Sequence, residues 1–275
     1  MSTENMFGAI SAEGTARERG GFTSGLNLGG IGTGGVELWP DGRFHFWNLV
    51  NARPWSKYQK SHARDGQKGD YSIDPITPGV MDTDFFIRVH EPGKRPVYRW
   101  LFTGHGLACT TASHFWRYHR YFFIKSYPEI EYKAAYPFIH LRYLDEEFPV
   151  ELSLRAWSSF IPRDVKHSSL PGFYLDFTVR NRGAHPIEVS LVWQQQNLAG
   201  YATETWEQRH DHRRLAGGVR AVQMAGSLTQ PDHDSSGDMT MWARAARGQR
   251  VTAIAANPYM QNVMWSVHQT GGLDG

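Results

Sequence analysis

Apolar and polar side chains alternate along Val150-Glu151-Leu152-Ser153-Leu154-Arg155-Ala156-Trp157. The valine, both leucines and the alanine fall on one side of an extended chain, which predicts a strand with one buried face. The segment Tyr174–Asn181 and residues 187–194 repeat the pattern. Such alternation is typical of antiparallel sheets that cover one face and expose the other.

Turn chemistry on either side of this region extends the β prediction. Pro40-Asp41-Gly42 separates two aromatic runs, residues 36–39 and 43–47, and has the composition of a hairpin turn. Further strands are expected over residues 84–90, 97–103, 113–118, 120–126, 130–134, 138–143, 219–224, 239–243 and 251–255. Surface loops are expected over residues 56–78, 198–218 and 230–237. We therefore predict an all-β fold, a two-sheet antiparallel β-sandwich with long loops.

The chain ends on a different pattern. Asn257-Pro258 suits the start of a helix, and the apolar residues that follow recur at spacings of three and four as far as Val267. A short C-terminal helix is predicted there. Residues 1–20 are polar and glycine-rich and are expected to be disordered, so the predicted β-sandwich domain spans residues 21–275.

Composition excludes several classes of protein. The 10 Trp, 12 Tyr and 15 Phe are too many for a disordered chain. The formal net charge of +2 predicts no nucleic-acid partner. No apolar run is long enough for a transmembrane segment. Cys109 is the single cysteine, so an internal disulfide is impossible, and the absence of a signal-peptide pattern favours a cytoplasmic location.

A glycine run matches a nucleotide-binding pattern by spacing alone. Gly30-Ile31-Gly32-Thr33-Gly34-Gly35 fits G-x-G-x-x-G, but a hairpin rather than a helix is predicted after it. A dinucleotide site needs that helix. The favoured interpretation is a place where two backbones cross closely without side chains between them.

Two polar runs contain residue types that occur in reactive sites. His210-Asp211-His212, together with His233 and Asp234, contains metal-ligand types without a diagnostic spacing, and a solvated loop is the favoured interpretation. Asp145-Glu146-Glu147 is interpreted as a solvated turn rather than an acid/base pair. No metal and no cofactor are predicted.

Tryptophans raise the question of sugar stacking. Those in predicted strands are assigned to the core, because large aromatics there are usually buried. Trp55 follows Arg53-Pro54 in a predicted loop and is the sugar-stacking candidate.

Several motifs occur in an order that resembles the N-terminal domain of glycoside hydrolase family 116, which includes β-glucosidases of the glucosylceramidase type. They are Tyr136-Pro137-Phe138, Phe148-Pro149-Val150-Glu151-Leu152, Trp157-Ser158-Ser159-Phe160-Ile161-Pro162-Arg163-Asp164 and Ser168-Ser169-Leu170-Pro171. The Gly29–Gly34 stretch and the hairpin after it are also similar to that domain, and the resemblance runs from about residue 21 to the end.

The resemblance implies a two-sheet β-sandwich followed by an (α/α)6 catalytic domain. Retaining glycosidases use a carboxylate nucleophile and a carboxylic acid/base about 5–5.5 Å apart. In this family both belong to the second domain, which this chain does not include, so no catalytic residue is assigned here. The implied partners are the catalytic domain of the same protein and, through it, a glycoside substrate.

One proline-bracketed loop is the candidate for an interdomain contact or a wall of the substrate pocket. Its candidate residues are Phe160, Ile161, Pro162, Asp164, Ser168 and Ser169. Loops held by a rigid scaffold commonly carry such contacts.

The first hypothesis is thus a non-catalytic N-terminal domain that packs on and supports a β-glycosidase. The second is a free-standing carbohydrate-binding, lectin-like sandwich that uses Trp55. The third is a small complete enzyme with a site among Asp145, Glu146, Glu147 and His210.

Overall fold

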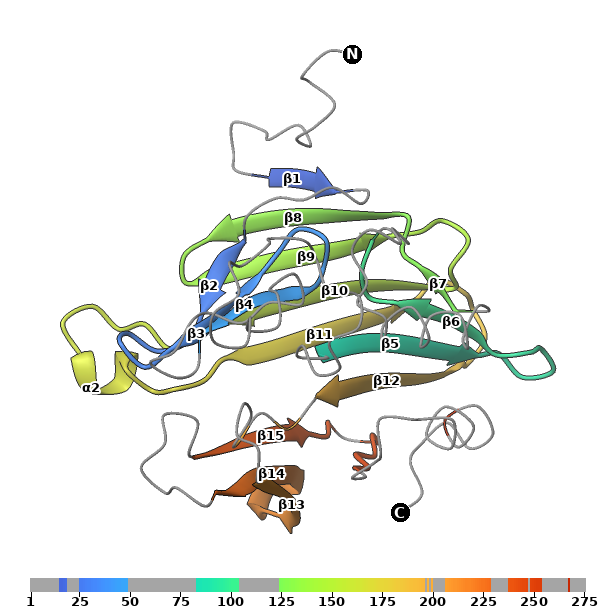
Figure 1. Ribbon diagram of the computed structural model, residues 1–275. Helices are drawn as coiled ribbons and strands as arrows, with labels where there is room; N and C mark the ends of the chain where they lie inside the picture. Colours follow the sequence, from blue (N-terminus) through green and yellow to red (C-terminus); the bar gives the residue numbers. More distant parts are fainter. Residues whose placement is uncertain are drawn as a thin grey trace, which may run out of the picture. The chain divides into compact units, whose positions relative to one another are not determined.

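The structure is a computed structural model (Figure 1). It describes residues 15–18, 25–48, 83–103, 124–195, 197, 199, 206–228, 237–246, 248–253 and 267. The chain divides into two compact units. Unit 1 comprises residues 1–187 and 191–194, and unit 2 comprises residues 188–190 and 195–275.

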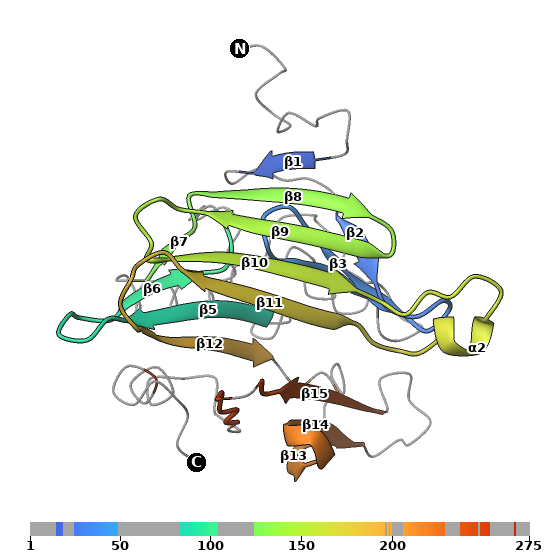
Figure 2. The ribbon, with the colours of Figure 1, turned by 180° about the vertical axis from the view of Figure 1, so that it is seen from behind.

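The largest sheet of unit 1 has the strand order β1-β8-β9-β10-β11, and all of its neighbours are antiparallel. Its strands are β1 (Thr15–Glu18), β8 (Glu129–Ala135), β9 (Phe138–Leu144), β10 (Val150–Trp157) and β11 (Tyr174–Asn181). Figure 2 shows the same sheet from behind. The predicted alternation in β10 is confirmed, because its valine, leucines and alanine are buried while Glu151 and Arg155 are exposed.

Three smaller sheets complete the described fold. Their strand orders are β12-β5-β6-β7, β2-β3-β4 and β13-β14-β15. The strands are β2 (Leu26–Leu28), β3 (Gly35–Leu38), β4 (Phe44–Asn48), β5 (Thr83–His90), β6 (Val97–Trp100), β7 (Lys125–Ser126), β12 (Glu188–Gln195), β13 (Trp206–Arg214), β14 (Val219–Leu228) and β15 (Asp238–Arg244). All pairs recorded within these three sheets are antiparallel except β6 and β7.

An aromatic cluster links the sheets of unit 1. The Phe85 ring of β5 lies 5.3 Å from that of Phe177 on β11 and 6.1 Å from that of Phe44 on β4. Phe85 also stacks on Trp193 of β12, with centroids 5.3 Å apart. Large aromatics bury much apolar area each, so this cluster is a main source of the core's stability.

The predicted all-β fold is confirmed, while the division into exactly two layered sheets stays a prediction. The hairpin turn is confirmed in detail. Asp41 Oδ1 accepts a hydrogen bond from the Arg43 N–H at 2.8 Å. Gly42 adopts a φ of 84°.

The loop predicted over residues 198–218 is wrong in part, because it contains strand β13. Charged and polar residues fill both faces of this strand and erase the period-two pattern. Antiparallel pairing with β14 holds it instead. The structure also gives no strand at residues 251–253, where one was expected.

The remaining differences between the predicted and the observed structure lie near the two ends of the chain. Strand β1 lies inside the segment expected to be disordered, and it pairs with β8 to form one edge of the five-stranded sheet. Of the predicted C-terminal helix only Val267 is described; it is helical and buried. The predicted strand at 113–118, most of 120–126 and the predicted loop at 56–78 lie outside the described residues.

Gly42 offers a test of the hairpin. A Cβ atom there would lie 2.5 Å from the Leu101 carbonyl oxygen, and φ is positive as well. We expect Gly42→Ala to lower the free energy of unfolding by about 3 kcal/mol. The matched control is Gly93→Ala, where φ is +80° but nothing lies within 4 Å of the added Cβ. It should cost only about 1 kcal/mol. Equal losses in urea denaturation would contradict the close approach to Leu101.

Candidate functional site

The loop after β10 is organised by a single helical turn, α2 (Val165–Ser168). Asp164 caps its N-terminus: Oδ1 accepts from the His167 N–H at 3.1 Å, and Oδ2 lies 2.6 Å from His167 Nδ1. The hydrogen bond from the His167 backbone N–H, followed by that from its ring, lowers the pKa of the Asp164 carboxyl below its usual 3.8. The carboxylate therefore stabilises the conformation of its own loop.

Ser168 holds the two sides of this loop together. Its side chain is buried, and its Oγ accepts from the Ile161 N–H at 2.9 Å and donates to the Ile161 carbonyl at 3.1 Å. The Ser169 N–H donates to the Val165 carbonyl at 2.9 Å. Both serines thus belong to a pinned loop, and Ser168 is satisfied within it rather than available as a nucleophile.

The glycine run packs against the same loop, and this close crossing of two backbones is of the kind that the favoured interpretation predicted. The Gly29 N–H donates to Ser158 Oγ at 2.6 Å, and the Ile31 N–H donates to the Ser168 carbonyl at 2.9 Å. A Cβ on Gly30 would lie 2.5 Å from the Leu170 carbonyl oxygen. Two backbones cross here without side chains between them, and a hairpin follows.

Exposed apolar side chains gather around α2. Their exposed fractions run from 38% for Phe160 to 70% for Val165. We call this set the α2 surface: Ile31, Tyr136, Phe138, Phe160, Ile161, Val165 and Leu170. Tyr136 and Phe160 touch edge to face, with ring centroids 5.1 Å apart. Figures 1 and 2 place α2 and the glycine loop at the same end of unit 1.

Sequence reasoning found Phe160 and Ile161 in this group but missed the others. The available signal was that Tyr136 and Val165 are apolar residues in turn positions, where polar residues are usual. Of the other predicted residues, Pro162 is exposed on the same loop, and Asp164 and Ser169 are partly buried within it.

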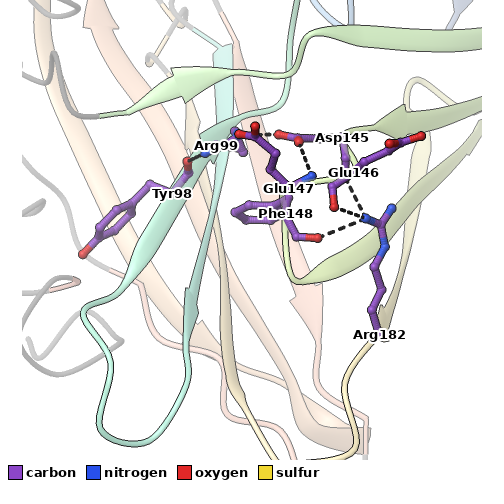
Figure 3. Close-up of polar contacts among 7 residues, drawn as sticks. All are labelled: Tyr98, Arg99, Asp145, Glu146, Glu147, Phe148 and Arg182. Atoms are coloured by element: carbon purple, nitrogen blue, oxygen red, sulfur yellow. Dashed lines mark hydrogen bonds and ion pairs between the residues drawn. The ribbon is translucent and has the colours of Figure 1, made fainter.

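The Asp145 run is a structural junction rather than a solvated turn (Figure 3). Asp145 is buried, and its Oδ2 accepts from Arg99 Nε of β6 at 2.6 Å. Its Oδ1 accepts from the Glu147 N–H at 2.9 Å. The prediction of a solvated turn was therefore wrong for Asp145, while Glu146 and Glu147 are exposed.

Arg182 closes the other side of this turn. Its Nη1 donates to the carbonyls of Asp145 at 2.7 Å and of Glu146 and Phe148 at 3.2 Å each. The guanidinium of Arg99 also lies 5.0 Å from the centroid of the Phe148 ring. Neither arginine was found from the sequence, because no local pattern ties them to a turn so distant along the chain.

The histidines of β13 do not form a metal site with described residues. His210 is partly buried, and burial followed by repulsion from His212 lowers its pKa. No group of three or more ligand-type side chains in the described parts of the chain is arranged so that it could hold a metal ion. His233 and Asp234 lie outside those parts, and His210 belongs to unit 2 while Asp145 belongs to unit 1.

The sugar-stacking candidate Trp55 lies outside the described residues. Trp39, Trp47 and Trp100 are buried, as expected for core residues. Trp157 is covered by Tyr174, with nearly parallel rings 5.2 Å apart. Within the described ranges no helix is long and apolar enough to cross a membrane.

A family model described as "beta-glucosidase 2, glycosyl-hydrolase family 116 N-term" matches residues 25–274. The chain belongs to this family. The resemblance seen in the motifs is thereby confirmed, and the chain is an N-terminal domain of a glycoside hydrolase. Comparison with curated proteins gives no match.

The buried ion pair of this family-116 domain can be tested by removing one charge. Asp145→Asn leaves the largely buried Arg99 side chain without its counter-ion, so we expect a loss of about 3–5 kcal/mol in the free energy of unfolding. Asp176→Asn is the matched control, because Asp176 pairs with Arg155 at 2.7 Å on the exposed surface. It should change stability by less than about 1 kcal/mol. Similar effects of the two substitutions would show that Asp145 is solvated.

The cap of α2 predicts a pH dependence. Because the pKa of Asp164 is lowered on folding, its stabilising effect is present above pH 3.8 and is lost as pH falls through the lower folded value. Wild type should therefore melt at a higher temperature than Asp164→Ala at neutral pH, and the gap should close in strong acid. A gap that is constant with pH would contradict the contribution of the charged carboxylate.

Proposed function

We propose that this chain is the non-catalytic N-terminal domain of a retaining β-glycosidase of the β-glucosidase/glucosylceramidase type, and that it packs on and supports the (α/α)6 catalytic domain. The family membership supports a glycoside hydrolase. The α2 surface is the observation that most directly supports packing on a catalytic domain. Large contiguous patches of exposed apolar side chains commonly mark interaction sites.

Two properties suit the α2 surface to docking. The loop is held by the hydrogen bonds of Ser168 and Asp164, so little conformational freedom is lost when a partner binds. The partner we assign to this surface is the catalytic domain of the same polypeptide, because a covalently linked domain is present at high effective concentration.

Two of the carboxylates singled out from the sequence have structural partners, which supports a non-catalytic role. Asp145 is engaged by Arg99, and Asp164 is engaged by His167. A retaining mechanism needs two carboxyl groups about 5–5.5 Å apart that both reach the glycosidic bond. In this proposal both are supplied by the catalytic domain, which binds the glycoside, and the protein acts in the cytoplasm.

The coding sequence beyond the codon for Gly275 gives the first test. We expect it to continue into several hundred helix-rich residues that include paired carboxylates. A stop codon directly after Gly275 would instead favour the free-standing carbohydrate-binding domain.

In the polypeptide so encoded, Val165→Glu places a charge on the α2 surface. We expect it to lower the melting temperature and to slow the hydrolysis of p-nitrophenyl β-glucoside severalfold. The reason is that a buried unpaired carboxylate opposes docking. Val97→Glu is the matched control; Val97 is 41% exposed on the β5–β6 hairpin, which Figures 1 and 2 draw away from α2. Unchanged activity and stability in Val165→Glu would remove the α2 surface from the interface.

A further inference from the structure

Two arginines lie directly opposite each other at the end of the β13–β14 hairpin. Arg214 of β13 pairs with Arg220 of β14. Side chains paired across antiparallel strands share a face, with Cβ atoms about 4.5–5.5 Å apart, and like charges in that position destabilise a sheet. Neither guanidinium forms an ion pair with a residue that the structure describes. No carboxylate of the described chain therefore neutralises their repulsion.

The same face of β13 adds two imidazoles. His212 and His210 precede Arg214 at alternate positions of the strand, so all three side chains lie on one face. Burial, followed by repulsion from His212, lowers the pKa of His210. Positive charge on this face is thus disfavoured further along the strand as well.

The carboxylates described in these strands lie on the opposite face. Asp211 pairs with Gln223, and the same glutamine donates a hydrogen bond to Asp238. Asp211 Oδ2 also lies 3.2 Å from Arg209 Nε. Among the described side chains of β13, β14 and β15, the face of Arg214 therefore has basic groups and no carboxylate.

The end of the hairpin is accessible from solvent. Arg214 and His212 are exposed, and Arg220 is partly buried. The turn between the two arginines is closed by the Leu215 N–H, which donates to a backbone carbonyl at 2.9 Å. A Cβ atom on Gly217, within this turn, would meet nothing within 4 Å. The arginines are thus held by a closed turn that leaves space around it.

This set of donors suits a phosphate group. Guanidinium forms parallel hydrogen bonds to phosphate oxygens. A phosphate carries up to two negative charges and three strong acceptor oxygens, so one group can serve both Arg214 and Arg220. Placed between them, it replaces the repulsion of two cations by two attractions. His212 is the next side chain on this face of β13 and can donate a further hydrogen bond.

We propose that the end of the β13–β14 hairpin binds a phosphate group through Arg214, Arg220 and His212. The phosphate belongs to a soluble compound or to a lipid headgroup. Leu215 separates these two sources, because it is 53% exposed beside Arg214 and gains contacts only where acyl chains lie beneath the phosphate. The site does not depend on the docking proposed for the α2 surface.

Calorimetric titration of the chain with inorganic pyrophosphate, at an ionic strength held constant with sodium chloride, tests the site. We expect Arg214→Gln and Arg220→Gln each to weaken binding about tenfold, because charge-assisted hydrogen bonds are lost. Their melting temperatures without ligand should not fall, because each substitution removes a like-charge pair. Such a result excludes a folding defect.

Arg213→Gln is the matched control. Arg213 is exposed and adjacent to Arg214 in the sequence, but it lies on the opposite face, where it pairs with Ala221. The net charge changes equally, so affinity should change less than about twofold if the contacts are specific. Equal weakening by Arg213→Gln and Arg214→Gln would show diffuse attraction and overturn the proposal.

Sedimentation with phosphatidylcholine vesicles, with and without phosphatidic acid, identifies the source of the phosphate. Binding that requires phosphatidic acid and is lost in Leu215→Ser, while pyrophosphate affinity is unchanged, supports the site and assigns a lipid headgroup. Binding of pyrophosphate without binding of either vesicle supports the site and assigns a soluble compound. No binding of pyrophosphate at millimolar concentration and none of the vesicles would overturn the proposal.

Discussion

The buried pair of Arg99 and Asp145 joins two sheets of unit 1. Arg99 belongs to β6 of the four-stranded sheet, and Asp145 follows β9 of the five-stranded sheet. A buried charge must keep its partner, so the turn after β9 is tied to the position of β6. Arg182 binds three carbonyls of the same turn, which also fastens the start of the loop after β11. The aromatic core then fills the space that these sheets share.

Around α2 the same requirement, that buried polar groups be satisfied, has a different consequence. Ser158 and Ser168 use their oxygens to hold the glycine run and the loop after β10 against each other. With its backbone tied inward in this way, the loop turns Phe160, Ile161 and Val165 outward. A rigid loop that exposes apolar side chains is better suited to packing on a partner domain than to reacting with a substrate.

Unit 2 separates its side chains by face rather than by loop. Met224, Met239 and Met241 lie on one side of the β13–β14–β15 sheet, and Trp242 lies on the other, opposite Ala221. The domain thus has two distinct kinds of exposed surface. One is the apolar α2 surface of unit 1, and the other is the face of unit 2 that carries Trp242, Arg213 and Arg244.

The amino-acid sequence alone determined the β class, the strand β10, the hairpin at Gly42 and the family, because alternation and turn chemistry are local along the chain. It also identified the loop of Phe160 and Asp164. It did not predict strand β13, whose faces both carry polar residues. Only the tertiary structure decided that Asp145 is buried beside Arg99, that the glycine run crosses the Ser168 loop and that Trp242 lies on the face opposite the methionines. Each of these depends on residues that are distant in the chain or on the register between strands, and neither is encoded in a local pattern.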